Sequence, residues 1–243
     1  MIKYILLFPL ILFGQQTKPI ELDRPDQTET PAIVPKKMFQ IESGFTMVKE
    51  KSEGNSFNVP STLWKYGLLQ NMELRLITEL TIQNTNEESV IGMTPVLIGC
   101  KIKISEEKGI LPKTSFIGHI ALPNVASEQL KADCIAPQFR FTMQHTLSDR
   151  FTLGYNLGAE WDGYSSSTVF IYTVTSGQAL SNRWGSYVEF FGFLPQKQMA
   201  NHNIDGGFTY LLNDNTMFDV SLGLGLTENT FQHYFAFGFS FRI

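Results

Sequence analysis

The stretch Gln232–Ile243 restricts the fold of this chain more than any other. From Phe235 to Ile243 every second residue is phenylalanine or isoleucine, and the residues between them are small or polar, ending in Arg242. Because successive side chains of a β-strand point to opposite faces, this pattern predicts a strand with one strongly apolar face. Such a face has to be covered by a second sheet or by lipid.

The same alternation recurs along most of the chain, in runs of about ten residues. We expect strands near 39–48, 59–69, 73–82, 94–105, 112–122, 132–147, 150–161, 168–179, 183–194, 203–212, 216–227 and 232–243. Short turns rich in Asn and Asp alternate with longer polar connections, which is typical of outer-membrane barrels. The predicted fold class is all-β, a transmembrane antiparallel up-and-down β-barrel of about 12 strands.

A secreted soluble sandwich or barrel would explain the alternation and the turns equally well. It explains less well why one parity carries charge on most strands while the other carries almost none. It also leaves unexplained why aromatic residues collect at strand ends, where a membrane barrel has interfacial girdles. We assign this role to Phe151, Trp161, Trp184, Tyr210 and Tyr234. A mean hydropathy of −0.05, with no apolar run of membrane-helix length after residue 13, excludes a helical membrane bundle.

The N-terminal region divides into two segments before the barrel. Residues 1–14 combine Lys3 with an apolar run and predict a cleaved signal peptide. Residues 15–37 contain four prolines and predict a periplasmic leader or plug segment, followed by the barrel over 38–243. The expected location is the outer membrane of a Gram-negative cell. The expected partners are outer-membrane lipid, the barrel assembly machinery and a small-molecule solute; a net charge of −4 gives no reason to expect nucleic acid.

Several blocks of the sequence resemble a known family. They are Leu22–Pro31 (LDRPDQTETP), Val34–Lys37 (VPKK), Gln40–Phe45 (QIESGF), Trp64–Leu68 (WKYGL) and Met72–Leu76 (MELRL). They are similar to the family described as "putative MetA-pathway of phenol degradation", a group of outer-membrane transporters common in Bacteroidetes-type genomes. The resemblance implies an exported, channel-like barrel and names no solute. Lys37 stands where the family pattern has glycine, and Ile243 stands where many barrels end in an aromatic residue.

The first of these blocks contains the candidate leader motif, Asp23, Arg24, Pro25, Asp26, Thr28 and Glu29. One hypothesis is a latch in the barrel mouth, with Arg24 paired to an inward carboxylate such as Glu42 or Glu73. Arginine between acidic residues suits bidentate pairing in a partly buried site. The alternative is a solvated periplasmic segment.

The inward parity of the strands supplies the lumen and constriction candidates. These are Glu42, Lys65, Glu73, Arg75, Glu79, Lys101, Lys103, Arg140, Glu160, Glu189, Asp205 and Asp219, with Arg242 near the end of the last strand. Acidic strands neighbour basic ones, which fits either a constriction for polar solutes or a salt-bridge ladder that fills a small lumen. The sequence predicts no metal site and no cofactor.

We therefore expect a channel for small solutes, with hydrophobic or aromatic ones as the candidates, and no catalysis. A barrel-rim lipid hydrolase is the first alternative, because His202, His233 and Ser165–Ser167 fall in outer loops or strand tops. The chain has no Gly-x-Ser-x-Gly stretch or other nucleophile signature to support it. A non-conducting structural or surface-interaction barrel is the second alternative.

Overall fold

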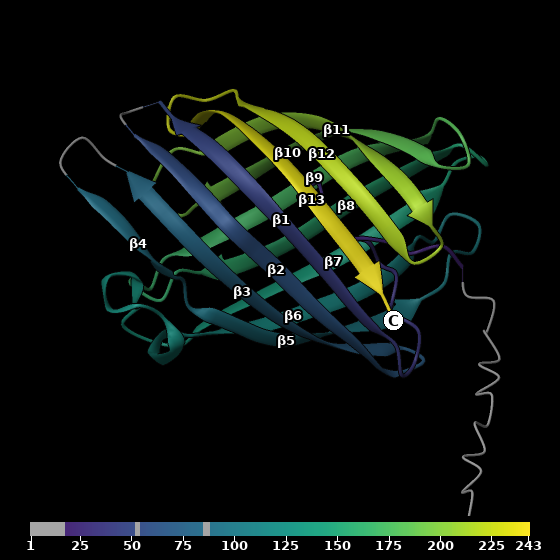
Figure 1. The fold of residues 1–243 in the computed structure, drawn as a ribbon, viewed down its shortest axis with the longest axis horizontal. Coiled ribbons are helices and arrows are strands. Elements are labelled where there is room, and N and C mark those ends of the chain that lie inside the picture. Colours follow the sequence, from purple (N-terminus) through teal and green to yellow (C-terminus); the bar gives the residue numbers. More distant parts are fainter. Residues whose placement is uncertain (1–17, 52–53, 85–87) are drawn as a thin grey trace, which may run out of the picture.

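The computed structural model describes residues 18–51, 54–84 and 88–243, and the predicted signal peptide lies outside them. These residues form a closed antiparallel barrel with one added strand (Figure 1). Its strands are β1 (Phe39–Glu50), β2 (Asn55–Leu69), β3 (Met72–Asn84), β4 (Ser89–Met93), β5 (Val96–Ser105), β6 (Lys113–Leu122), β7 (Ala136–Thr146), β8 (Phe151–Trp161), β9 (Thr168–Ala179), β10 (Trp184–Pro195), β11 (Asn201–Asn213), β12 (Thr216–Gly225) and β13 (Phe231–Arg242). Two single-turn 3₁₀ helices, Pro123–Val125 and Glu128–Leu130, lie between β6 and β7.

The barrel closes between its first and last strands. β1 pairs with β13 from Gln40↔Arg242 onward, and the backbones of Phe39 and Ile243 exchange hydrogen bonds of 2.8 Å. Every barrel strand thus has two neighbours, which removes the open edge that lipid would leave unsatisfied. Both ends of the strand sequence lie at the end of the barrel that carries the short turns, here called the turn end. The opposite end, with the longer connections, is called the loop end (Figure 1).

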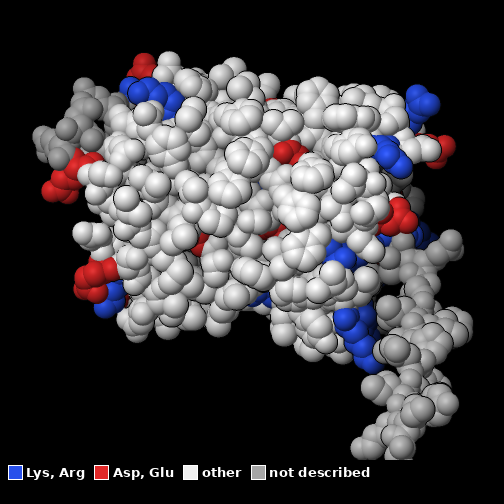
Figure 2. All heavy atoms as spheres, in the orientation of Figure 1, with Lys and Arg blue, Asp and Glu red and all other residues white. Residues whose placement is uncertain are grey.

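The outer face of the barrel is apolar. In β13, Phe235, Phe237 and Phe239 are 40–50 % exposed, whereas Tyr234 and Ala236, on the opposite parity, are buried. Figure 2 shows that charged side chains gather towards the two ends of the molecule and that the band between them is mostly uncharged. A lipid bilayer accounts for this distribution, because its hydrocarbon covers an apolar band without a second sheet.

The inner face is polar and densely filled. Many of its buried side chains are charged or amide-bearing, including Gln40, Glu42, Lys65, Glu73 and Lys101, each no more than 1 % exposed. The small apolar cluster inside the barrel consists of Phe191, Tyr234 and Ala236. The interior is therefore held by hydrogen bonds and ion pairs more than by a hydrophobic core.

The predicted fold class and its twelve barrel strands are confirmed. β4 was not predicted; its five residues pair only with the loop-end part of β3, from Asn84↔Ser89 to Leu80↔Met93. The girdle assignment of Tyr234 was wrong, because its side chain points into the lumen and donates a hydrogen bond to Asp205. None of the helices among the described residues is long and apolar enough to cross a membrane.

Candidate functional site

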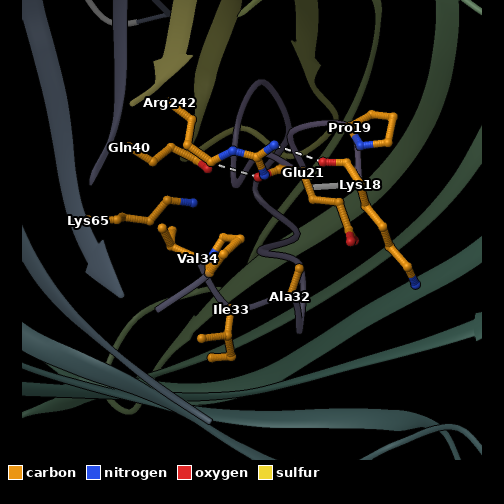
Figure 3. A pocket seen from close by; sticks show the side chains of 10 residues that line it. Lys18, Pro19, Glu21, Ala32, Ile33, Val34, Gln40, Lys65 and Arg242 are labelled. Atoms are coloured by element: carbon orange, nitrogen blue, oxygen red, sulfur yellow. Dashed lines mark hydrogen bonds between the residues drawn. The ribbon is translucent and has the colours of Figure 1, made fainter. Parts of the chain in front are cut away.

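The described part of the leader, residues 18–37, lies inside the turn-end half of the barrel. It starts at the turn end, where Ile20 donates to the carbonyl of Asp214. It returns there at Lys37, whose backbone N–H donates to the carbonyl of Gly67 over 2.7 Å. Figure 3 shows this end of the leader, with Gln40, Lys65 and Arg242 around it. Lys37 has a φ of 68°, in the left-handed region that favours the glycine expected from the family pattern.

Side chains of the wall satisfy the backbone of the leader. The N–H groups of Asp23 and Arg24 both donate to Glu42 Oε2, at 2.8 and 3.1 Å. Further contacts join Gln27 N to Glu189, Glu29 N to Asn156, Val34 N to Glu73, the Pro31 carbonyl to Ser115 and the Thr30 carbonyl to Lys101. An irregular segment has no ladder partners, so its buried N–H and C=O groups need such acceptors and donors. The polar inner parity of the strands meets that requirement.

Asp23 sits at the centre of the most heavily charged part of the lumen. Its Oδ1 lies 2.7 Å from Lys101 Nζ, and its Oδ2 lies 2.9 Å from Lys65 Nζ and 2.8 Å from Arg75 Nη1. The three cationic side chains are at most 2 % exposed. Arg75 also reaches Glu29 Oε2 at 2.5 Å, so two leader carboxylates bind one guanidinium. Charge-assisted hydrogen bonds of this kind are the strongest that side chains make.

Arg24 crosses the lumen in the other direction. Its Nη2 lies 3.1 Å from Oδ1 of Asp219 on β12, so the side chain pairs with an inward carboxylate as predicted, but with neither of the two examples, Glu42 and Glu73. Both of those carboxylates are already occupied, Glu42 by Lys65 and the two leader amides, and Glu73 by Arg75 and the Val34 amide. The guanidinium lies against glycines on two paired strands: a Cβ on Gly44 would come within 2.1 Å of Arg24 Cζ, and one on Gly238 within 2.6 Å of Nε. Glycine is required here for close approach.

Gly44→Ala is therefore expected to loosen the leader without opening the barrel wall. The new Cβ displaces the flexible end of Arg24 and costs its bond to Asp219, about 1.5–3 kcal/mol for a charged hydrogen bond. Amide hydrogen exchange over residues 19–31 should become roughly 10- to 100-fold faster. Gly118→Ala is the control, because its Cβ meets only the ring of Phe116 at 3.4 Å. Equal exchange rates in the two variants would contradict this role of Gly44.

The acidic residues of the leader, which lies outside the membrane-spanning strands, are in two different environments. Burial opposes ionisation of Asp23, yet the charges of Lys101, Lys65 and Arg75 hold its pKa well below the usual range. Burial likewise opposes ionisation of Glu29, and the charges of Arg75, Arg140 and Lys101 together outweigh it and lower the pKa. For Asp26, burial and then the charge of Asp205 raise the pKa to about 8, so this carboxyl is largely protonated at neutral pH. The negative charge that Asp23 and Glu29 give the leader thus lies beside the basic side chains of the wall, Lys65, Arg75 and Lys101.

The other predicted lumen residues divide into those that touch the leader and those that do not. Arg140 donates to the Gln27 carbonyl at 3.1 Å, and Glu189 bonds the hydroxyl of Thr28. Asp205 binds Tyr234, and Lys103 pairs with Glu106 near the turn end. Glu79 and Glu160 line separate cavities.

Sequence reasoning missed two groups of lumen residues. The first is neutral and polar: Asn156, Thr173 and Ser115 bind the leader and are at most 1 % exposed. The second is aromatic: Phe191 lies two residues after Glu189 and so faces inward, and it packs against Phe193. The alternation along β10 places Phe191 on the inward face and could have predicted this. Barrel interiors are generally polar, so an inward aromatic residue was not expected.

Two cavities approach the leader from opposite ends of the barrel. The loop-end cavity has a volume of about 310 Å³, and Phe191, Phe193, Phe231 and Tyr234 form its aromatic side. The turn-end cavity has a volume of about 500 Å³ and extends past residues 146–152 and 177–187. The residues that line both cavities are Arg24, Pro25 and Asp26. This tripeptide is therefore the partition between them.

The residues considered for other chemistry have different contacts. His202 Nδ1 lies 2.6 Å from the hydroxyl of Tyr172, and Ser165 bonds Asp162 within its own loop. Within residues 18–51, 54–84 and 88–243, no group of three or more His, Cys, Asp or Glu side chains is arranged to hold a metal ion.

Comparison with known proteins gives the chain a family and a set of structural neighbours. The family model described as "Putative MetA-pathway of phenol degradation" matches residues 22–243. An outer membrane channel from Pseudomonas putida F1 is similar with a TM-score of 0.70 at 9 % identity, covering 92 % of this chain and 100 % of the other. The NanC porin has a TM-score of 0.59 at 9 % identity, covering 84 % and 100 %, and the KdgM porin one of 0.56 at 9 %, covering 83 % and 98 %. No curated protein sequence matches the chain.

Proposed function

Since the chain belongs to the "Putative MetA-pathway of phenol degradation" family, we propose that it passes small aromatic solutes across the outer membrane through its lumen. In this proposal the loop end faces outward, the turn end faces the periplasm, and the leader is a displaceable plug. The fold is that of outer-membrane channels and is consistent with this orientation.

The partition at Arg24-Pro25-Asp26 is the observation that carries the proposal. A lumen filled only for stability would need no cavity on either side of its filling. Here two cavities end at the same three residues, which belong to a segment with no β-ladder pairing. A small movement of that segment would join the cavities while all barrel strands remained paired.

The loop-end cavity supports aromatic solutes in particular. Phe191, Phe193 and Phe231 face a lumen that is otherwise polar, beside a rim that includes Asn58 and Glu79. Aromatic rings offer a solute ring both apolar area and edge-to-face contacts. A cavity of about 310 Å³ is at the small end of the range for ligand sites and suits a single-ring compound.

The double variant Phe191→Ala/Phe193→Ala tests this assignment. We expect the uptake of benzyl alcohol at low concentration, measured above that of protein-free vesicles, to fall by roughly 5- to 150-fold, because the two lost ring pairs contribute about 0.5–1.5 kcal/mol each. Glycerol uptake should not fall. Phe208→Ala is the matched control, since that side chain is 51 % exposed on the outer face. An equal loss for both solutes, or none for benzyl alcohol, would rule out aromatic recognition at this cavity.

A further inference from the structure

We propose that Lys65, Arg75 and Lys101, here called the cation triad, form a binding site for the carboxylate of the solute. Asp23 occupies this site while the leader is docked. The inference rests on the proposed function and narrows its solute class to aromatic carboxylates. The ring would be held by the loop-end cavity and the acid group by the triad.

The geometry around Asp23 is that of a complete carboxylate site. The triad residues come from three strands, β2, β3 and β5, and meet at one carboxylate with N–O distances of 2.7–2.9 Å. Both oxygens are bound, and Oδ1 also accepts the N–H of Thr30 at 3.0 Å. A carboxylate accepts up to about four hydrogen bonds, so the site satisfies the group fully. Three of these four donors belong to the wall and would remain if the leader moved away.

The charge balance of the wall shows why an anion has to replace Asp23. Around the triad the wall contributes four basic side chains, counting Arg140, and two acidic ones, Glu42 and Glu73. The leader brings Asp23 and Glu29, which make the region neutral. Withdrawal of the leader leaves an excess of positive charge on buried cations, and uncompensated buried charge is strongly unfavourable.

A carboxylate solute offsets that cost directly. It takes the place of Asp23 at the triad and so restores one of the two negative charges that leave with the leader. A neutral solute of the same shape leaves the triad unpaired and displaces the leader less readily. The acid group of the solute thus couples its own binding to the release of the plug.

Asp23→Ala tests the site by vacating it. Benzoate binding to the refolded full-length mature chain would be measured by titration calorimetry in detergent micelles at constant ionic strength. We expect the variant to bind benzoate at least tenfold more tightly than the wild type, because Asp23 no longer competes for the triad. Adding Lys101→Met should weaken this binding roughly 10- to 100-fold, the effect of losing one charge-assisted hydrogen bond. Adding Lys197→Met, in an exposed loop, should leave it unchanged. If Asp23→Ala does not fold, Asp23→Asn removes the negative charge while keeping the volume of the side chain.

The outcomes separate this inference from the proposed function. Benzoate binding that is no tighter in the variant, is indifferent to Lys101, or is displaced equally by chloride at the same concentration overturns the carboxylate site. If vesicles that contain the protein still take up benzyl alcohol faster than protein-free vesicles in that case, the channel for aromatic solutes stands. If benzyl alcohol does not enter but benzoate binding follows Asp23 and Lys101, the site stands and the channel fails.

Discussion

Deletion of residues 18–37 is expected to raise the single-channel conductance of the barrel severalfold and to shift it towards anion selectivity. The deletion removes the partition at Arg24–Asp26 and joins the cavities of about 310 and 500 Å³. It also leaves the basic side chains Lys65, Arg75, Lys101 and Arg140 facing the pore, which raises the local concentration of anions. The measurement is conductance and reversal potential across a planar bilayer under a KCl gradient.

The comparison requires a folded barrel and a leader change that spares the partition. Heat-modifiable migration in electrophoresis reports closure of the deleted chain. Lys36→Ala serves as the control, because this exposed residue lies near the end of the leader and does not line either cavity. A folded deletion variant with the conductance of the wild type would show that the leader does not limit passage.

Arg75→Met is expected to destabilise the protein by about 3–5 kcal/mol, the cost of removing one partner from a buried ion-pair network. Arg75 contacts Asp23, Glu29 and Glu73 at 2.5–3.0 Å, and its Nε lies 3.1 Å from His119 Nε2. Methionine, a side chain of similar length, leaves three carboxylates without one of their donors in a buried site. The free energy of unfolding in lipid vesicles, from a denaturant titration, gives the magnitude.

Lys103→Met is the matched change on the same inner face. Lys103 pairs with Glu106 near a turn, and the two side chains are 29 % and 67 % exposed. Surface pairs contribute about 0–1 kcal/mol, so this variant should stay close to the wild type. If Arg75→Met lost no more stability than Lys103→Met, the buried network would not be what holds the leader.

Strand alternation was enough to predict most of the barrel, because an up-and-down sheet between lipid and a polar lumen imposes its period on every strand. Phe151–Trp161 and Thr168–Ala179 show this most clearly. β4 escaped the same reasoning because it is five residues long and adds only to the loop-end part of β3.

The site was less predictable than the fold, because parity gives the face of a side chain and not its height in the barrel. The sequence places both Glu42 and Asp219 on the inward face. The path of the leader through the lumen determines that the Arg24 side chain pairs with Asp219. The glycines next to the Arg24 side chain could have indicated its position, because Gly44 and Gly238 lie opposite each other on the two strands that close the barrel. Recognising it requires the register of β1 against β13, which no local sequence pattern provides.

The contacts of the leader also bear on the order of assembly. The leader is synthesised before every strand, yet its partners extend from Glu42 on β1 to Arg242 on β13, up to 224 residues along the chain. Closing so long a loop is entropically costly until the intervening strands are in place. The full set of bonds can therefore form only around a nearly completed barrel. Docking of the leader therefore comes last in assembly. The charges of the lumen are balanced and its hydrogen bonds complete only when all the strands are present in the right register.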